Sequence, residues 1–167
     1  MTLLRFAFLA LAALALAGCQ SAAPEKPKDY EPLVARFYLE AKPNEAGVAV
    51  TLPQSGVAIA VAPKPVVVEY DIANAEVAQV DLGRCLLVQL NSAASRDLYR
   101  LSVSGIGRRL VLALNDQFVG ARRIDQAIAD GAVLIFLETP EAELPGQVER
   151  LKRTSADLAE AARKARR

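Results

Sequence analysis

The sequence predicts an α+β fold in which an antiparallel sheet is packed by two helices and follows an N-terminal β-rich segment. In residues 33–41, apolar side chains at the odd positions alternate with Val34, Arg36, Tyr38 and Glu40. This is the period of a strand with one solvated face. Two β-branched runs at 48–52 and 57–61 are joined by Pro53-Gln54-Ser55-Gly56, which is typical of a hairpin turn. Two later segments carry apolar residues at helical spacing.

The first half of the predicted domain ends in another extended segment, from Pro65 to Tyr70. Pro63 and Pro65 place it near a sheet edge, because proline removes a donor from the strand ladder. We divide the domain into a β-rich segment at 33–70 and an α+β segment at 71–167, and expect 33–167 to form one compact unit.

The α+β segment mixes strands with both helices. Asn91-Ser92 offers an N-cap for a helix over 93–104, and glycines at 105 and 107 end it. Asn115-Asp116 supplies a turn between two strands. The strands expected in this half are 77–82, 85–90, 110–114, 118–124 and 132–137.

The last helix is predicted to open at Pro145 and to carry an apolar stripe. The stripe recurs at three- and four-residue steps and consists of Val148, Leu151, Ser155, Leu158 and Ala162. We interpret it as a core face, with a partner-binding face as the alternative. The basic tail, 163–167, complements the helix dipole, and attraction to anionic lipid is the alternative there.

The N-terminus is typical of an exported protein. Residues 1–18 contain one cation, Arg5, and an apolar run from 6 to 17 that is too short for a bilayer core of roughly 30 Å. The run ends in Leu16-Ala17-Gly18-Cys19, which resembles the lipobox of bacterial lipoproteins. The resemblance implies cleavage of the signal peptide before Cys19 and acylation of its thiol. An ordinary signal peptide with a chance cysteine is the alternative.

Residues 19–32 are rich in proline and charge and are predicted to tether the domain to the membrane. Several acyl chains on Cys19 would make this attachment effectively permanent. We therefore expect a lipid-anchored, periplasm-facing protein of the bacterial cell envelope. Gln20 stands where an Asp would signal retention in the inner membrane, so the pattern resembles sorting to the outer membrane.

Composition excludes several functions. The chain has no His, which removes an imidazole base and a Ser-His-Asp triad, and two Cys alone cannot complete a tetrahedral zinc site. A net charge of +1 argues against nucleic-acid binding. We expect no enzyme activity, no cofactor, no metal and no small-molecule substrate. Cys85 lies in an apolar run and is interpreted as a buried small hydrophobe, with a reactive thiol as the alternative.

An ordered set of residues between 71 and 137 carries a family resemblance. Asp71-Ile72 opens the stretch, which leads through the predicted helix to Gly105-Ile106-Gly107-Arg108-Arg109-Leu110-Val111-Leu112-Ala113-Leu114-Asn115. The matching residues around this run are Ala75, Val77, Val119, Ala121, Ile124, Ile128 and Gly131. The stretch resembles the first large extracytoplasmic domain of SecD, a subunit of the bacterial protein-export machinery. The resemblance implies a ferredoxin-like α+β form and contact with emerging polypeptide.

This sequence also departs from the SecD pattern. The family usually has proline at the position of Arg122, and Asp-Gly at the position of Asn115-Asp116. The membrane-spanning helices that couple SecD to the proton gradient have no counterpart in this sequence. The resemblance therefore does not imply an energy-transducing activity.

Four arginines are the candidate partner-binding residues: Arg108, Arg109, Arg122 and Arg123. The first pair follows the glycine-rich helix end, and the second lies on the strand expected to pair with 110–114. We expect the two pairs near opposite ends of that strand pair. They form either a salt-bridged surface facing Asp97, Glu76 or Asp125, or a cationic rim for acidic or carbonyl-rich segments.

The leading hypothesis is a non-catalytic, lipid-anchored envelope protein that binds a protein or polypeptide partner, linked to protein export. The mechanism we expect is β-augmentation, with the strands of 48–70 as the exposed edge. The alternative is a structural envelope lipoprotein that acts through its C-terminal helix. An enzyme is a third hypothesis, in which Asp116 and Asp125 would act with Arg122 as in two-carboxylate hydrolysis.

Overall fold

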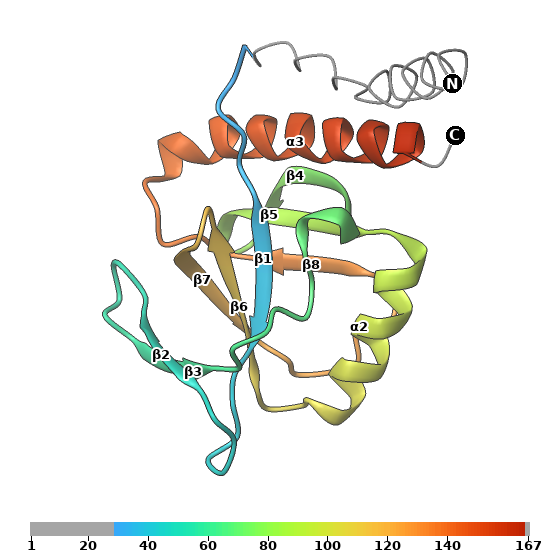
Figure 1. The fold of residues 1–167 in the computed structure, drawn as a ribbon. Coiled ribbons are helices and arrows are strands. Elements are labelled where there is room, and N and C mark those ends of the chain that lie inside the picture. The colour runs from blue at the N-terminus through green and yellow to red at the C-terminus, as the bar shows by residue number, and fades with distance from the viewer. Residues whose placement is uncertain (1–28, 166–167) are drawn as a thin grey trace, which may run out of the picture.

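Antiparallel strands and two long helices make up most of residues 29–165, the part of the chain that this computed structural model describes (Figure 1). The α+β class is confirmed. In chain order the elements are β1 (Ala35–Leu39), β2 (Val48–Thr51), β3 (Ala58–Val61), η1 (Glu69–Asp71), β4 (Ile72–Val80), β5 (Gly83–Leu90), α2 (Ser92–Ser104), β6 (Arg109–Leu114), β7 (Gln117–Arg123), β8 (Ala132–Ile135), η2 (Glu141–Glu143) and α3 (Leu144–Ala165).

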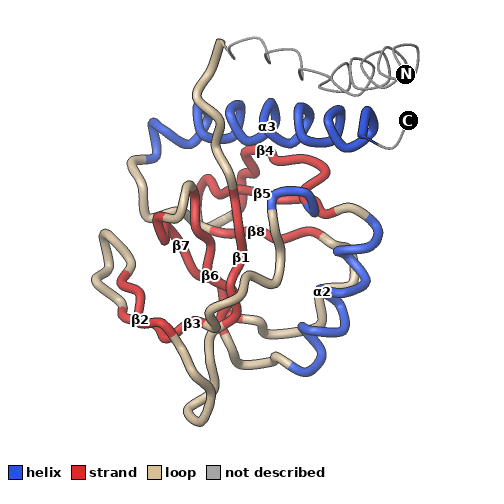
Figure 2. Tube along the Cα trace, in the orientation of Figure 1, coloured by secondary structure: helices blue, strands red, loops and turns tan. Residues whose placement is uncertain are grey.

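Within residues 29–165 the strands form two three-stranded sheets and one hairpin. One sheet has the order β1-β6-β7, the other has the order β4-β5-β8, and β2 pairs with β3. All of these pairings are antiparallel. The strands of the second half therefore lie in two sheets, because β6 and β7 join β1 from the first half. In Figure 2 the strands of the two sheets run in different directions.

Apolar side chains from both three-stranded sheets meet in one core. Phe37 of β1, Leu112 of β6 and Leu86 of β5 are fully buried there. The helices contribute Leu98 from α2 and Leu151 from α3, each only 2% exposed. Burial of each such side chain stabilises the fold by about 1.5–3 kcal/mol.

The predicted helix at 93–104 is confirmed as α2, together with its N-cap. The side-chain oxygen of Asn91 accepts hydrogen bonds from the backbone N–H groups of Ala93 and Ala94, both at 3.0 Å. The helix ends at Gly105, whose N–H donates to the carbonyl of Ser102. These bonds satisfy backbone groups that a helix end leaves without a partner.

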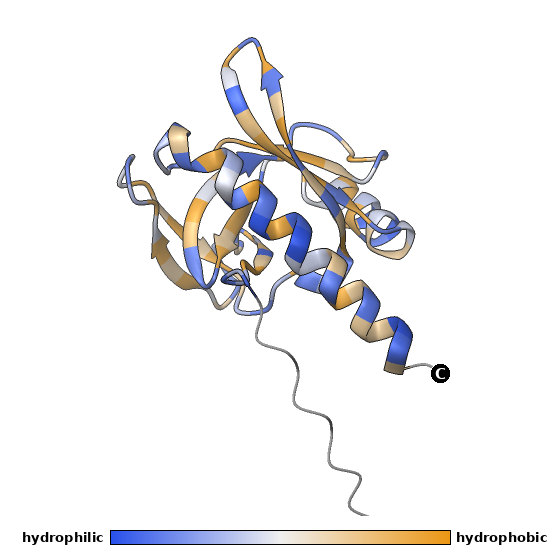
Figure 3. Ribbon diagram, turned by 90° about the horizontal axis from the view of Figure 1, so that it is seen from above, coloured by the Kyte–Doolittle hydropathy of each residue, from blue (hydrophilic) through white to orange (hydrophobic). Residues whose placement is uncertain are grey.

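The apolar stripe of the last helix is used by the core. α3 begins one residue before Pro145, and Leu144, Val148 and Leu151 are buried in the core. Ser155 is also buried, Leu158 is half-buried and Ala162 is exposed. The core interpretation thus holds for the first half of the stripe. Figure 3 looks down on α3 and shows that hydrophilic and apolar residues are interspersed along the helix.

The chain entering the domain is bound to α3. The buried N–H of Leu33 donates to Oγ1 of Thr154 at 3.0 Å, and the hydroxyl of Tyr30 donates to Asp157 at 2.7 Å. The guanidinium of Arg153 lies 4.2 Å from the centre of the Tyr30 ring. Contacts with the domain therefore begin near Asp29, inside the predicted tether of 19–32. The rest of that tether, the signal peptide and Cys19 lie outside the described residues.

The predicted extended segment 65–70 is extended only in part. The N–H of Phe37 donates to the carbonyl of Val67 at 2.9 Å, so the segment covers the outer edge of β1. The chain then turns into η1, where Asp71 accepts from the N–H of Val68 at 2.9 Å. β4 begins at Ile72, five residues before the predicted start at 77, and Leu82 lies in the turn after it.

Candidate polypeptide-binding edge

The β2–β3 hairpin leaves one strand edge uncovered. β2 and β3 pair from Val48↔Val61 to Thr51↔Ala58. β3 then continues against the end of β1, where Ala41 N–H donates to the Ala60 carbonyl at 2.8 Å. In the described part of the chain, no strand pairs with the other side of β2. Figure 1 shows the hairpin projecting from the body of the domain.

A second, smaller apolar cluster holds the hairpin against the outer face of the β1-β6-β7 sheet. Its buried members are Val50, Leu52, Ile59 and Val61 of the hairpin region and Val111 of β6. Tyr38 and Phe118 pack beside it, with their ring centroids 5.3 Å apart in an edge-on arrangement. The alternation of buried and exposed residues along β2 and β3 follows from this one-sided packing.

The tip of the hairpin is bound by a carboxylate. Glu138 accepts hydrogen bonds from the N–H groups of Gln54 and Ser55, both at 2.9 Å, and from the Ser55 hydroxyl at 2.6 Å. Burial opposes ionisation of Glu138, but the hydrogen bonds from Ser55 and Gln54 outweigh it and lower its pKa. Gly56, with φ of 67°, completes the turn in a conformation that glycine adopts without strain.

The hydrogen-bond pattern tells which backbone groups of β2 face outward. Leu52 N–H donates to the Val57 carbonyl at 3.0 Å, so residues 52 and 57 form a hydrogen-bonded pair. Antiparallel ladders alternate between bonded and non-bonded pairs. Val50 and Val48 therefore bond toward β3, whereas the N–H and C=O groups of Ala49 and Thr51 point away from it. An added strand would meet these groups.

Of the segment 48–70, which was predicted to offer an exposed strand edge, only β2 has backbone groups available to an added strand. Residues 66 and 67 are not an open edge, because their backbone bonds to Phe37 of β1. The free side of β8 is also partly covered, since Arg122 of β7 donates to the carbonyl of Leu134 at 3.3 Å. The carbonyl of Val119 accepts from Glu138 N–H nearby, at 2.6 Å.

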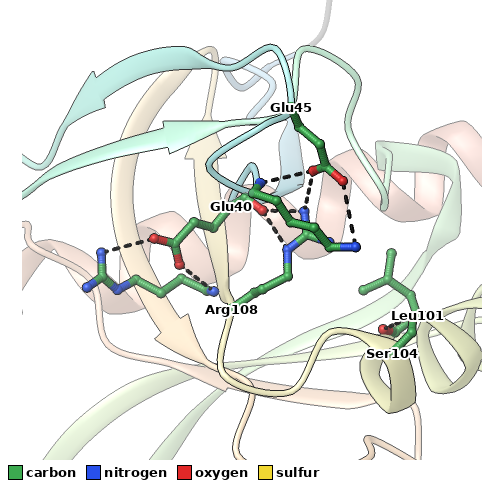
Figure 4. A network of polar contacts seen from close by, with 7 residues as sticks. Glu40, Glu45, Leu101, Ser104 and Arg108 are labelled. Carbon is green, nitrogen blue, oxygen red and sulfur yellow. Dashed lines mark hydrogen bonds and ion pairs between the residues drawn. The ribbon is translucent and has the colours of Figure 1, made fainter.

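Arg108 and Arg109 are occupied by the segment that follows β1 (Figure 4). Arg108 donates from Nε to the carbonyl of Glu40 at 2.7 Å and from Nη2 to the Glu45 carboxylate at 3.2 Å. Glu40 accepts from the N–H of Arg109 at 2.9 Å, and its other oxygen lies 3.6 Å from the Arg109 guanidinium. The N–H of Lys42 and the charge of Arg108 lower the pKa of Glu45. Arg108 and Arg109 thus form ion pairs, but with Glu40 and Glu45 and not with the predicted partners: Asp97 pairs with Arg100, and Glu76 accepts a hydrogen bond from Asn74.

The prediction that the two arginine pairs lie near opposite ends of the β6–β7 pair is wrong. Arg109 lies directly opposite Arg123, and Leu110 lies opposite Arg122. In an antiparallel hairpin the start of the first strand meets the end of the second, which brings all four arginines to the end away from the turn. Arg123 is exposed and lies 3.8 Å from Asp125, whereas Arg122 is half-buried.

The residues of the enzyme hypothesis are not brought together. Asp116 is in the turn before β7, where it lies 3.1 Å from Arg36, and Asp125 follows the far end of β7. The length of a strand separates the two carboxylates. Cys85 is 1% exposed, which agrees with a buried small hydrophobe. Burial raises the pKa of its thiol, an effect that the charge of Arg122 partly offsets.

Comparison with known proteins finds similarity in structure. No family model matches the sequence, and no curated protein matches it. A solved structure of the membrane component SecDF that enhances protein export matches with a TM-score of 0.56, 18% identity and 75% of this chain covered. A crystal structure of SecDF in a super-membrane-facing form matches with a TM-score of 0.56, 18% identity and 73% of this chain covered.

The fold is SecDF-like. The matched region spans 63% of the first SecDF chain and 18% of the second, so the likeness extends over part of each SecDF chain. Of the helices in the described residues, none is long and apolar enough to cross a membrane.

Proposed function

We propose that this protein is a non-catalytic, lipid-anchored envelope protein whose SecD-like domain binds an extended polypeptide by strand addition to β2, in the service of protein export. The observation that supports it best is an uncovered strand edge on a SecDF-like fold. The solved SecDF structure concerns a component that enhances protein export, which is the source of the proposed process.

The edge of β2 suits this role because it is held in place before a partner arrives. The inner face of the β2–β3 hairpin is packed through Val50 and Ile59, and the tip of the hairpin is bound by Glu138. A strand that is already ordered pays less conformational entropy on binding. The outward groups of Ala49 and Thr51 allow about four backbone hydrogen bonds, so we expect weak binding that is tolerant of sequence.

The side chains beside the edge also permit close approach. Ala49 and Thr51 are exposed on β2, and Ala58 and Ala60 are exposed on β3. Small side chains leave the backbone of β2 accessible from the solvent side. Charged side chains and proline, which protect many natural strand edges, are absent from β2.

The experiment uses Ala49→Pro, which removes one of the two outward N–H groups of β2, that of residue 49, and leaves the pairing with β3 intact. The matched control is Ala49→Thr, which keeps that N–H. The probe is a fluorescently labelled model polypeptide kept unfolded by alkylation of its cysteines, with binding followed by anisotropy. We expect roughly tenfold weaker binding for the proline variant alone. Equal binding by both variants, at equal melting temperature, would refute strand addition.

Membrane attachment is tested separately. Mass spectrometry of the protein purified from membranes should find the N-terminal residue to be an acylated Cys19. Cys19→Ser should release the protein into the soluble periplasmic fraction. An unmodified Cys19 would refute the lipid anchor but would leave the proposal of strand addition to β2 unaffected.

The alternative role through the C-terminal helix has less support. Val148 and Leu151 of α3 belong to the core, so they are not available to a partner. Deletion of 145–167 would consequently unfold the domain and could not test this role. Single substitutions at exposed positions such as Ala161 are the suitable test.

A further inference from the structure

Part of the outer face of the β4-β5-β8 sheet is apolar although no described helix or sheet covers it. The rest of that face carries Asn74, Glu76 and Gln89, which are joined by hydrogen bonds. The inner face of the sheet carries the core residues Leu86, Val133 and Ile135. Leu87 and Leu134 are directly opposite each other on the outer face, and Leu134 is 36% exposed. A solvated sheet face normally carries polar side chains. Here it also carries Ala78, Val80 and Ala132.

This face forms the floor of a hollow with a volume of about 570 Å³. The chain between β7 and β8, residues 126–130, forms one wall. Asp130 lines the hollow, and its carboxylate accepts the N–H of Ala132 at 3.1 Å. The hollow is open to solvent and lies on a different sheet from the β2–β3 hairpin.

Arg122 supplies the positive charge of the hollow. It lies opposite Leu110, a core residue, so its stem starts on the inner side of β7 and its guanidinium reaches the lining of the hollow. One N–H donates to the Leu134 carbonyl at 3.3 Å, and a guanidinium has five such donors. Arg36, Arg108, Arg109 and Arg123 form ion pairs, whereas no carboxylate among residues 29–165 pairs with Arg122.

We propose that this hollow is a second polypeptide site, distinct from the β2 edge, that binds an apolar segment carrying an acidic side chain. The carboxylate would pair with the remaining donors of Arg122, while neighbouring apolar side chains cover Leu87 and Leu134. Arginine and carboxylate form charge-assisted, bidentate hydrogen bonds, which fix both position and direction. The hollow is concave, so it fits a single chain segment better than the flat surface of a bilayer.

The test uses two synthetic peptides labelled with fluorescein, one of alternating valine and glutamate and one of alternating valine and lysine. Because the β2 edge is expected to tolerate any sequence, the measurements use the Ala49→Pro background, in which that edge is weakened. There we expect saturable binding of the glutamate peptide alone. Arg122→Gln should weaken it roughly tenfold, and Leu134→Thr should weaken it several-fold through the floor of the hollow. The matched control is Arg123→Gln, which removes the neighbouring charge and should leave binding unchanged.

Nuclear magnetic resonance spectra of the labelled domain locate the peptide. Shifts should concentrate at Ala78, Leu87 and Leu134 and should persist in Ala49→Pro, which separates this site from the β2 edge. Absence of saturable binding below about 1 mM overturns the proposal. It is also overturned by equal binding of both peptides, by equal loss in the two arginine variants, or by binding only to phosphatidylglycerol vesicles. Melting temperatures of all variants exclude unfolding as the cause.

Discussion

Glu138 and Ser55 are 83 positions apart in the sequence, yet the carboxylate of one accepts two hydrogen bonds from the other, at 2.9 Å from the N–H and 2.6 Å from the hydroxyl. The contact joins the segment after β8 to the tip of the β2–β3 hairpin. It makes the geometry of the candidate edge dependent on a residue outside the hairpin.

Replacement of this carboxylate should loosen the hairpin. Glu138→Gln removes the charge that three donors share, so we expect a loss of about 1 kcal/mol in the free energy of unfolding. Denaturation in urea measures it. The matched control is Glu141→Gln, whose exposed ion pair with Arg84 should contribute less than about 0.5 kcal/mol. If both variants lost the same unfolding free energy, the contact of Glu138 with the hairpin would stabilise the fold no more than an exposed ion pair.

The same contact predicts a dependence on pH. The pKa of Glu138 in the folded protein is below its ordinary value of 4.5. Its contribution to stability is therefore complete above that value and is lost as the pH falls through the lower, folded value. The difference in unfolding free energy between wild type and Glu138→Gln should shrink on acidification below pH 4.5. A constant difference down to the acid limit would contradict this.

The ion pair of Arg36 with Glu69 should outweigh its pair with Asp116. Arg36 binds both oxygens of Glu69, at 2.9 and 3.2 Å, and the side chain of Glu69 is 18% exposed against 79% for Asp116. The hydrogen bonds from Arg36 also lower the pKa of Glu69. We expect Glu69→Gln to cost about 1 kcal/mol and Asp116→Asn to cost close to nothing. Thermal melts at pH 7 and at low salt compare the two variants.

Two glycines with the same φ should respond differently to alanine. Gly131 and Gly56 both have φ of 67°. A Cβ at Gly131 would lie 2.0 Å from Oγ of Ser95, whereas a Cβ at Gly56 meets nothing within 4 Å. Gly56→Ala should cost about 1 kcal/mol from strain alone, and Gly131→Ala considerably more. Ser95→Gly should rescue much of the second loss, and failure of that rescue would point to backbone strain instead.

Thr154 should hold the entering chain on α3. Thr154→Val removes the acceptor for the buried N–H of Leu33, at an expected cost of about 1–3 kcal/mol. Limited proteolysis should then cleave near residues 29–33 faster than in wild type. Lys152→Ala, at an exposed position of the same helix, is the control. Unchanged cleavage in Thr154→Val would mean that the contacts of Tyr30 with Arg153 and Asp157 hold the entering chain on α3 without Thr154.

Local features of the fold could be predicted because their signals lie within a few residues. Asn91 caps α2 as its position predicts, and the turn at Asn115-Asp116 has φ of 46° and 65°. The hairpin at 48–61 is likewise confirmed.

The long-range contacts could not be predicted in the same way. Arg108 meets Glu40 and Glu45 across more than 60 positions, and many arrangements of the same charges were equally consistent with the sequence. The polar composition of 19–32 indicated a tether. Nothing local in the sequence shows that Arg150 and Arg153 of α3 bind Glu31 and Asp29 at the end of this segment. The sequence shows the charge of Arg122. That its guanidinium reaches the outer face of the β4-β5-β8 sheet depends on how this sheet packs against the β1-β6-β7 sheet.

The attachment of Leu33 to Thr154 has a consequence for synthesis. β1 pairs with β6, and Leu33, two residues before β1, bonds to a residue that follows 121 positions later. A chain that emerges N-terminal end first cannot complete this core until α3 is also available. Contacts of such high sequence separation slow folding. The nascent domain must therefore stay open until nearly its whole length has been made, which leaves it exposed to chaperones and proteases in the interval.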